Sequence, residues 1–352
     1  MRVKELQKTL EKGVCAIIQN PVNRFYLSGF RSSAGMIVLT ENKAVLLVDF
    51  RYFEKAKKTV QNMEVVLANN FFANAKELLE TENIKKILPE TDFINLDSFE
   101  RMQKAFEGIE VSNDNSLSQT ISSLRQIKSA EETKCIKKSQ GITDNAFAHI
   151  LNFIKAGVTE REIALELEFF MRKTGSEGVA FDTIAVSGKN SSLPHGVPTE
   201  KPLENGDFLT MDFGAVYNGY CSDMTRTVAV GYVTDEQQKV YDTVLKAQLS
   251  ALKEIGPNKV CKEIDKIARD IINKEFEGCF GHGLGHSVGL EIHENPALNT
   301  RDETLLKAGV IMTVEPGIYI PDKFGVRIED MVLITDTSYE NLTKSPKELI
   351  II

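Results

Sequence analysis

Residues 208–230 read FLTMDFGAVYNGYCSDMTRTVAV, and this stretch decides the fold of the chain around it. At its centre, Asn218 and Gly219 form the two-residue turn signal that most strongly favours a β-hairpin between β-rich arms. Strand-like segments punctuated by Gly and Pro continue on both sides of it, from Phe181 to about residue 335. We therefore expect a mainly antiparallel sheet in this half of the chain.

The predicted hairpin brings two acidic side chains together. With the turn at 218–219, Asp212 lies opposite Thr225, and Asp223 lies opposite Gly214. The two aspartates then share a face as diagonal neighbours, with Cα atoms about 7 to 8 Å apart, so both carboxylates can reach shared cations. On a buried face they repel each other and need protonation or positive charge, and a pair of metal ions would supply that charge. The alternative is that both are solvated carboxylates on an exposed face.

A second cluster, FGHGLGHSVGLEIHENP at residues 280–296, holds three of the five histidines. They are His282, His286 and His293, and the glycines among them argue against a helix. A fourth, His195, also lies in a loop rich in Gly, Pro and Ser. A single loop histidine is more often structural than catalytic, but three together beside acidic strands favour a functional cluster.

The third cluster is TVEPGIYIPDKFGVRIED at residues 313–330. Glu315 precedes a Pro-Gly turn among apolar residues, where water is scarce, so we expect it to be paired or bound to a metal. Arg327 and Glu329 alternate on one strand face. The alternative for Glu329 is a surface ion pair with Arg327.

The rest of the chain predicts a second, smaller domain ahead of these motifs. Up to about residue 115, short apolar runs alternate with amphipathic stretches, which is typical of an α/β layer. Residues 112–123, SNDNSLSQTISS, are polar and suit a linker. We therefore expect an α/β domain at 1–117 and an α+β domain at 124–352, which agrees with the size at which chains divide.

Composition excludes several classes of function. The formal charge of −8 disfavours binding to phosphate backbones, so no nucleic-acid partner is expected. No stretch approaches the roughly 18 apolar residues that span a bilayer, and the first residues lack the apolar block of a signal peptide, so we expect a cytoplasmic protein without a membrane role. The five cysteines form no C-x-x-C pair, which predicts reduced thiols.

The order of the three clusters resembles a known pattern. DFGA, GYCSDMTRT, GHS, EPGI and RIED follow one another as in the family of methionine aminopeptidase, prolidase and aminopeptidase P, over about residues 125–352. NRFYLSGF and VDFRY in the N-terminal part are similar to the extra domain of the Xaa-Pro branch and of creatinase. The resemblance implies a C-terminal pita-bread domain preceded by a smaller creatinase-like α/β domain.

The resemblance also implies a dinuclear metal centre. Its ligands would be Asp212, Asp223, His286, Glu315 and Glu329. Asp212 would bind one ion through both oxygens, Asp223 and Glu329 would bridge both ions, and the other two would complete the second ion. Four carboxylates and one imidazole favour Mn²⁺, with Co²⁺ or Zn²⁺ as alternatives.

The implied reaction is hydrolysis of the Xaa-Pro bond at the N-terminus of dipeptides or short peptides by a hydroxide that bridges the two metal ions. Glu315 would be the general base. His282 and His293 would donate hydrogen bonds to the substrate or to the developing oxyanion. His195 would lie near the substrate amine, and Arg327 would orient Glu329 or a substrate carboxylate.

Other functions remain open at this point. Methionine aminopeptidase shares the ligands but usually lacks the N-terminal domain, and creatinase shares both domains without needing metal. A non-catalytic binding protein on this fold and an aminopeptidase of other specificity are the remaining alternatives. The resemblance suggests a homodimer, and the sequence does not decide between dipeptides and longer peptides.

Overall fold

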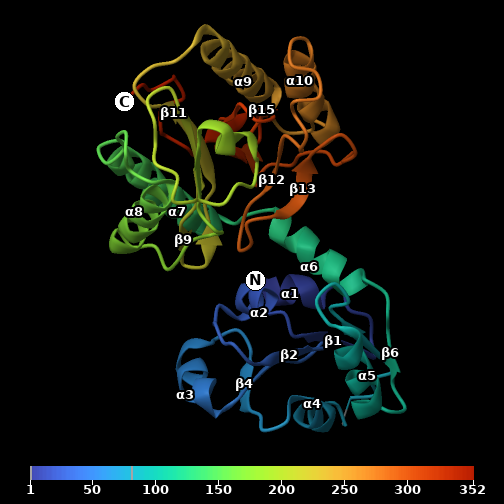
Figure 1. The fold of residues 1–352 in the computed structure, drawn as a ribbon. Coiled ribbons are helices and arrows are strands. Elements are labelled where there is room, and N and C mark those ends of the chain that lie inside the picture. Colours follow the sequence, from blue (N-terminus) through green and yellow to red (C-terminus); the bar gives the residue numbers. More distant parts are fainter. Residues whose placement is uncertain (1, 81) are drawn as a thin grey trace. The chain divides into compact units, whose positions relative to one another are not determined.

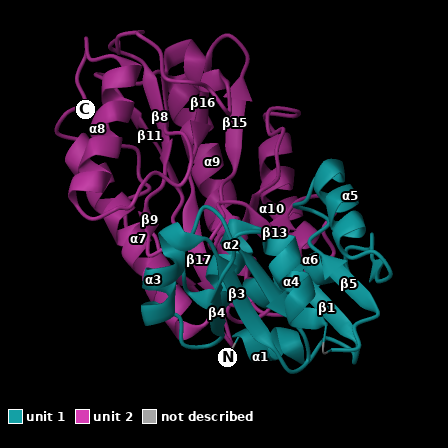
Figure 2. Ribbon diagram, turned by 90° about the horizontal axis from the view of Figure 1, so that it is seen from below, with its two compact units in different colours: residues 1–125 teal, residues 126–352 magenta. Residues whose placement is uncertain are grey.

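The computed structural model describes residues 2–80 and 82–352. They form two compact units, residues 1–125 and residues 126–352, which Figure 2 distinguishes by colour. In the described residues, none of the helices combines the length and the apolar character that crossing a membrane requires.

The first unit is built on one six-stranded sheet (Figure 1). In spatial order its strands are β4 (Glu64–Leu67), β3 (Ala44–Val48), β2 (Met36–Leu39), β1 (Val14–Ile18), β5 (Lys86–Pro89) and β6 (Glu110–Val111). β2 pairs antiparallel with both neighbours, and the other pairings are parallel. The helices are α1 (Arg2–Gln7), α2 (Pro21–Ser28), α3 (Phe50–Thr59), α4 (Phe71–Leu79), α5 (Leu96–Ala105) and α6 (Ser116–Gln126). The α/β prediction for this part of the chain is confirmed.

The segment 112–123, expected to be an irregular linker, contains most of the helix α6 (Ser116–Gln126). Leu117 and Ile121 are four residues apart, so they fall on one face of the helix, and both are buried. Contacts within the chain divide it after Arg125, two residues beyond the end of this segment. Two apolar residues at helical spacing were enough to form a helix in an otherwise polar stretch.

The second unit contains several antiparallel sheets. A three-stranded sheet has the order β11 (Met224–Ala229), β8 (Phe208–Phe213) and β7 (Ile184–Ser187). A five-stranded sheet has the order β13 (Glu294–Leu298), β12 (Gly285–Ser287), β14 (Ile311–Val314), β17 (Asp330–Ile334) and β18 (Tyr339–Asn341). Two short ribbons are β9 (Val216–Tyr217) with β10 (Tyr220–Cys221), and β15 (Gly317–Ile320) with β16 (Phe324–Arg327). The expected mainly antiparallel α+β unit is confirmed.

Helices pack against these sheets and bury their apolar faces. They are α7 (Ala130–Ile150), α8 (Glu160–Lys173), α9 (Asp235–Glu254) and α10 (Cys261–Asn273), with a 3₁₀ helix η1 (Gly188–Ser192). Phe147 of α7 and Leu167 of α8 share one apolar core with Leu209 and Met211 of β8. Residues of α9 and α10 share a second core with β14 and β17. The sheet faces that do not pack against these helices are therefore available for the polar side chains of the site.

The hairpin has the register predicted from its turn. Asn218 and Gly219 have φ angles of 48° and 85°, both positive as a type I′ turn requires. Asp212 pairs with Thr225, as expected, and Tyr217 pairs with Tyr220 in the same register nearer the turn. Asp212 and Asp223 therefore lie on one face.

The same hairpin contains a glycine whose replacement we expect to be costly. A Cβ atom at Gly214 would lie 1.9 Å from the backbone oxygen of Ser222, which the neighbouring strand holds in place. Gly214→Ala should lower the free energy of unfolding by about 1 to 3 kcal/mol, as for other overpacked sites.

The matched control is Gly141→Ala in α7, where a Cβ atom would meet nothing within 4 Å. It should raise the free energy of unfolding by about 0.5 to 1 kcal/mol, because alanine favours a helix over glycine. Thermal unfolding of both variants measures the difference. Equal stability of the two would contradict the close approach at Gly214.

Candidate metal centre

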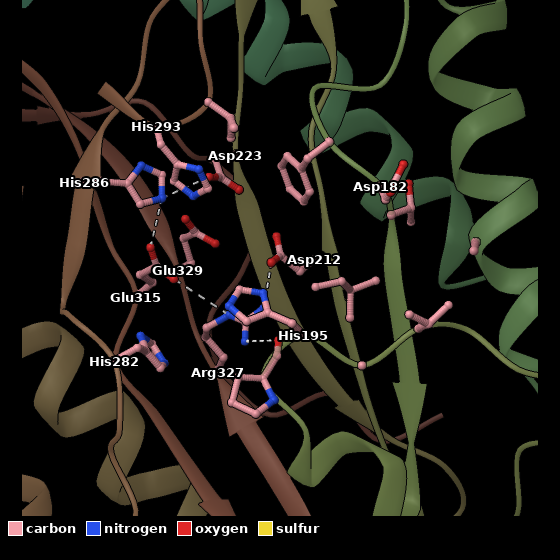
Figure 3. A pocket seen from close by; sticks show the side chains of 18 of the residues that line it. Asp182, His195, Asp212, Asp223, His282, His286, His293, Glu315, Arg327 and Glu329 are labelled. Carbon is pink, nitrogen blue, oxygen red and sulfur yellow. Dashed lines mark hydrogen bonds and ion pairs between the residues drawn. The ribbon is translucent and has the colours of Figure 1, made fainter. Parts of the chain in front are cut away.

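A cavity of about 780 Å³ lies in the second unit, among the sheets and the loops that leave them. The nine site residues predicted from the sequence all line it: His195, Asp212, Asp223, His282, His286, His293, Glu315, Arg327 and Glu329. Figure 3 shows their side chains converging from strands and loops far apart in the chain. The three sequence clusters therefore meet in one place.

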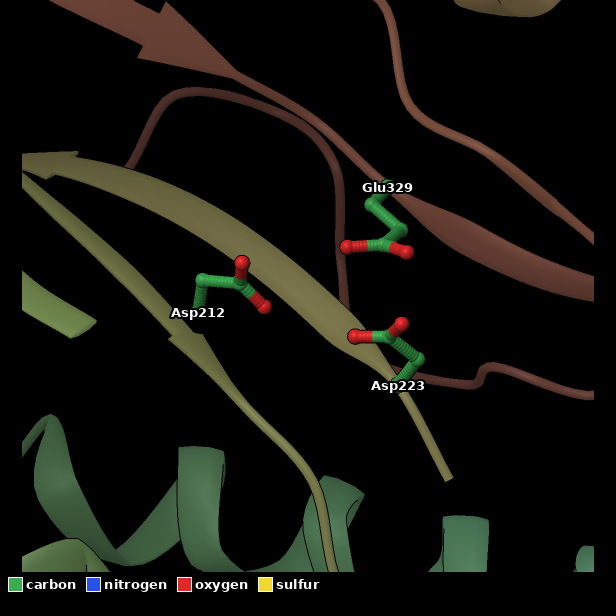
Figure 4. A group of neighbouring side chains, drawn as sticks. All are labelled: Asp212, Asp223 and Glu329. Carbon is green, nitrogen blue, oxygen red and sulfur yellow. The ribbon is translucent and has the colours of Figure 1, made fainter. Parts of the chain in front are cut away.

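Three carboxylates from separate strands form the centre of this site (Figure 4). Asp212 lies on β8, Asp223 directly precedes β11, and Glu329 directly precedes β17. Each offers an oxygen atom, and these atoms all lie within 4.8 Å of one another. The backbone N–H of Glu329 donates to the carbonyl oxygen of Thr225 at 3.1 Å, which joins the third carboxylate to the hairpin.

Two oxygen atoms in this group are buried and have no hydrogen-bond partner. They are Oδ1 of Asp212 and Oε1 of Glu329. The other oxygen of Asp212 accepts from Arg327 at 2.6 Å, and the other oxygen of Glu329 accepts from the Thr225 hydroxyl at 2.7 Å. A buried acceptor without a partner is costly, and a cation between the carboxylates would supply one. These carboxylate oxygens are therefore suitable ligands for a divalent metal ion.

The pKa values of the metal-free protein point the same way. Burial raises the pKa of Asp223 well above its usual range, and the nearby charge of Glu329 adds to the shift. Burial also raises the pKa of Glu329 well above its usual range, with a further contribution from Glu315. These carboxylates repel one another because the protein provides too little positive charge, and a bound cation would remove the repulsion.

Glu315 and His286 form a second edge of the site. Nε2 of His286 lies 3.3 Å from Oε1 of Glu315 and 3.7 Å from Oδ2 of Asp223. Burial alone would raise the pKa of Glu315, but the hydrogen bond and charge of His286 lower it to about 2. The hydroxyl of Thr313 accepts from the backbone N–H of His286 at 2.9 Å and donates to Glu315 at 3.0 Å. One threonine thus aligns both side chains.

Arg327 lines the cavity with the other predicted residues. Its guanidinium pairs directly with Asp212. Nε of Arg327 donates to the Thr225 hydroxyl at 2.9 Å, and that hydroxyl in turn donates to Glu329. The alternative of a surface ion pair is wrong, because Arg327 and Glu329 are only 3% and 1% exposed. The expected alternation on one strand is wrong too, because Arg327 ends β16 whereas Glu329 directly precedes β17.

The other three predicted site histidines also line the cavity. Nε2 of His282 lies 3.0 Å from the Tyr319 hydroxyl, which accepts from Arg327 at 2.8 Å. The ring of His293 meets that of His286 edge to face, with centroids 4.4 Å apart. Burial lowers the pKa of His282 and of His293, and neutral imidazoles of this kind can donate one hydrogen bond. His195 is exposed to the cavity from its loop.

An ion pair outside the cavity, with a partly buried arginine and a fully buried aspartate, fixes the loop around His282. Arg269 of α10 donates to the backbone oxygens of Phe280 at 2.8 Å and His282 at 2.7 Å. Its partner Asp265, also on α10, accepts from the backbone N–H of Leu284 at 3.0 Å. The pair thus holds both sides of the loop that carries His282.

A similar pair supports the loop ahead of β13. Nζ of Lys128 lies 3.0 Å from Oε2 of Glu294, and both side chains are almost fully buried. Lys128 also donates to the Ser287 hydroxyl at 3.3 Å, next to His286 in the chain. Glu294 accepts from the backbone N–H of Leu290 at 3.0 Å. This pair therefore joins the two ends of the segment between His286 and His293.

Sequence reasoning missed the residues that support the site. Thr225 could have been found, because it faces Asp212 in the predicted register. Tyr319 and Asp182 also line or contact the site, although the sequence analysis singled out neither of them. Asp265 and Arg269 are four residues apart in a helical segment, which predicts an ion pair between them. This spacing does not show that the pair also binds the loop that carries His282.

Comparisons with known proteins agree with this geometry. Residues 134–336 match the model of metallopeptidase family M24, and residues 2–127 match the creatinase/prolidase N-terminal domain. The structure is similar to that of an Xaa-Pro dipeptidase from Bacillus anthracis, with a TM-score of 0.96 and 41% identity over 100% of this chain and 99% of that one. It is also similar to an X-Pro aminopeptidase from Thermotoga maritima MSB8, with a TM-score of 0.92 and 37% identity over 99% and 100%. An Xaa-Pro dipeptidase of Pyrococcus furiosus is 39% identical over 99% of both chains. The expected creatinase-like domain followed by a pita-bread domain is confirmed.

Removal of the charge of Asp223 should raise the stability of the metal-free protein and weaken its binding of metal. Folding raises the pKa of this carboxyl, so the metal-free protein loses stability as pH rises from the unfolded pKa of about 3.9 through the folded pKa. Asp223→Asn should therefore melt at a higher temperature than wild type at pH 8 in the presence of chelator. Below about pH 4 the advantage should disappear.

Added Mn²⁺ should raise the melting temperature of the wild type and leave that of Asp223→Asn almost unchanged, because the substitution removes a ligand charge. Differential scanning calorimetry with elemental analysis measures both effects. A variant that still binds as much metal as the wild type would show that Asp223 is not a ligand.

The adjacent histidines should separate by metal content. His286 lies against two of the candidate carboxylate ligands, whereas His293 contacts the His286 ring. His286→Ala should lose metal, and His293→Ala should keep the wild-type metal content. Elemental analysis of both purified variants decides the assignment, and equal losses would show that the ligand within this cluster is misassigned.

Proposed function

The chain belongs to metallopeptidase family M24, and from this premise we propose that it is an exopeptidase that hydrolyses the Xaa-Pro bond at the N-terminus of dipeptides or short peptides. The observation that carries the proposal is the pair of buried, unpartnered carboxylate oxygens beside Glu315 and His286 in a cavity of about 780 Å³. The relatives named Xaa-Pro dipeptidase and X-Pro aminopeptidase support the choice of bond.

The chain uses divalent metal, as its family implies, and we propose Mn²⁺ as the ion, with Co²⁺ or Zn²⁺ as alternatives. The residues that would hold two ions are Asp212, Asp223, His286, Glu315 and Glu329. When bound, such ions polarise a peptide carbonyl and lower the pKa of water. Arg327 and Thr225 orient Asp212 and Glu329 for this purpose through the hydrogen bonds described above.

The other side chains would act on the substrate. With its pKa near 2, Glu315 is a carboxylate at neutral pH, so it can accept the proton of the attacking water and deliver it to the leaving nitrogen. His282 and His293 would hydrogen-bond the substrate carbonyl as negative charge develops on it. His195 would contact the substrate near its amine. Apolar side chains such as Phe181, Ile184 and Ile292 line the cavity, and these could surround a proline ring.

Proline in the second position fits this lining because the Xaa-Pro nitrogen carries no N–H after peptide formation. A pocket for the proline ring therefore needs no hydrogen-bond acceptor for the proline nitrogen. This agrees with the apolar side chains in the cavity lining. We also propose that the protein is a cytoplasmic homodimer. Only the homodimer rests on the match of the N-terminal unit to the creatinase/prolidase N-terminal domain.

The test compares peptides that differ at one position. Metal-free protein, prepared with a chelator, should be inactive on Ala-Pro and Ala-Pro-Ala, and added Mn²⁺ should restore hydrolysis. Ala-Ala-Ala is the matched control and should be cleaved far more slowly. The ratio of rates on Ala-Pro and Ala-Pro-Ala decides between a dipeptidase and an aminopeptidase.

Three outcomes would contradict the proposal. Full activity in protein shown by elemental analysis to be free of metal would exclude the metal-dependent mechanism. Faster cleavage of Ala-Ala-Ala would point to an aminopeptidase of other specificity. Binding of Ala-Pro without any cleavage would favour the non-catalytic binding protein.

A further inference from the structure

Glu160, the first residue of α8, is a fully buried carboxylate behind the wall of the cavity. We propose that it is a positioning residue, which holds residues 188–200, here called the His195 loop, so that His195 faces the substrate. The inference rests on the proposed function, because it assigns His195 a role in catalysis. No motif in the sequence pointed to Glu160.

The two oxygens of Glu160 divide between the two ends of this loop. Oε1 accepts from the backbone N–H of Ser187 at 2.7 Å and from its hydroxyl at 3.0 Å. Oε2 accepts from the backbone N–H of Thr199 at 3.0 Å and from its hydroxyl at 2.6 Å. The side-chain amide of Asn190 lies within hydrogen-bond distance of both oxygens, at 3.1 and 3.2 Å. A single carboxylate therefore closes the loop.

The location of Glu160 stabilises its charge. It occupies the first turn of α8, where the helix dipole favours a negative charge. Hydrogen bonds to a charged acceptor are stronger than bonds between neutral groups, and this carboxylate accepts from two backbone and three side-chain groups. Backbone bonds from Glu160 to Lys201 and from Arg161 to Thr199 bring the end of the loop to the same place.

The middle of the His195 loop has little apolar burial to hold it. Leu193 is 58% exposed and Val197 is 77% exposed, although both are apolar. On the cavity side, the backbone oxygen of Pro194 accepts from Arg327 at 3.2 Å. Polar contacts therefore hold the loop at three places. They are Glu160 at its ends, the Ser191 hydroxyl, which accepts from the backbone N–H of Gly325 at 2.9 Å, and Arg327 beside His195. Loss of the end contacts should move His195 relative to the carboxylates.

The first test is Glu160→Gln, which keeps the shape of the side chain but replaces one oxygen with an NH₂ group. That group cannot accept from a backbone N–H, so one end of the loop loses its partner. We expect kcat/KM on Ala-Pro-Ala to fall roughly 10- to 100-fold, since a misplacement of about 1 Å can cost about 10² in rate. Metal content should equal that of the wild type, because Glu160 contacts none of the candidate ligands among the described residues.

The matched control is Glu162→Ala on the same helical turn. Glu162 is exposed and closes the capping box with Thr159, so its loss weakens the start of α8 without touching the loop. It should leave kcat/KM near the wild-type value. A loss of activity as large as that of Glu160→Gln would overturn the proposal, because helix stability would then explain both results.

A double-mutant cycle with His195→Ala separates positioning from a general effect on the fold. If Glu160 acts through His195, adding Glu160→Gln to His195→Ala should cost little more, and the two losses should be far from additive. Additive losses would overturn the proposal. If Glu160→Gln does not fold, Glu160→Asp replaces it, since a shorter carboxylate cannot reach both ends of the loop.

Hydrogen exchange supplies a readout that does not depend on catalysis. Amides within residues 187–200 should exchange faster in Glu160→Gln than in the wild type, with no change in Glu162→Ala. Unchanged exchange would overturn the anchoring role. If the wild type cleaves no Xaa-Pro peptide, the proposed function fails, and exchange alone then decides whether Glu160 holds the loop.

Discussion

The site depends on negative charge that the protein alone does not neutralise. Asp212, Asp223, Glu315 and Glu329 converge in one cavity, where Arg327 pairs with Asp212 and His286 lies against Glu315. Burial nevertheless raises the pKa values of Asp212, Asp223 and Glu329. Folding thus brings together acids that favour a cation, and binding of that cation is coupled to stability.

This arrangement requires strands from different sheets to be held in register. The type I′ turn fixes the relative positions of Asp212 and Asp223, and Thr225 joins the hairpin to Glu329. Behind these strands, Arg226 pairs with Asp330 at 2.7 Å, and both side chains are essentially unexposed. Arg226 also donates to the backbone oxygen of Thr225 at 2.9 Å. A buried ion pair with its hydrogen bonds made therefore supports the face that carries the candidate metal ligands from the opposite side. Removal of either partner would leave a buried charge without compensation and destabilise the fold.

His286 lies on β12, but His195, His282 and His293 reach the cavity from loops, which are held in a different way. Gly-rich and Pro-rich segments bury few large side chains, so apolar packing does not determine their path. Instead, buried charged side chains bind their backbones from outside: Asp265 with Arg269, Lys128 with Glu294, and Glu160. Each of these charged residues lies on a helix or strand or within two residues of one. The regular elements therefore set the positions of the loops.

The sequence by itself determined the features that depend on local pattern. The Asn-Gly turn specified the hairpin register, and motif order predicted nine residues that line one cavity. Only the tertiary structure decided which partner each charge takes, such as Asp212 for Arg327, 115 residues away along the chain. It also decided that Glu160 contacts both ends of the His195 loop. Turns and periodicity act over a few residues, whereas these contacts form only when distant segments pack, and no local spacing encodes them.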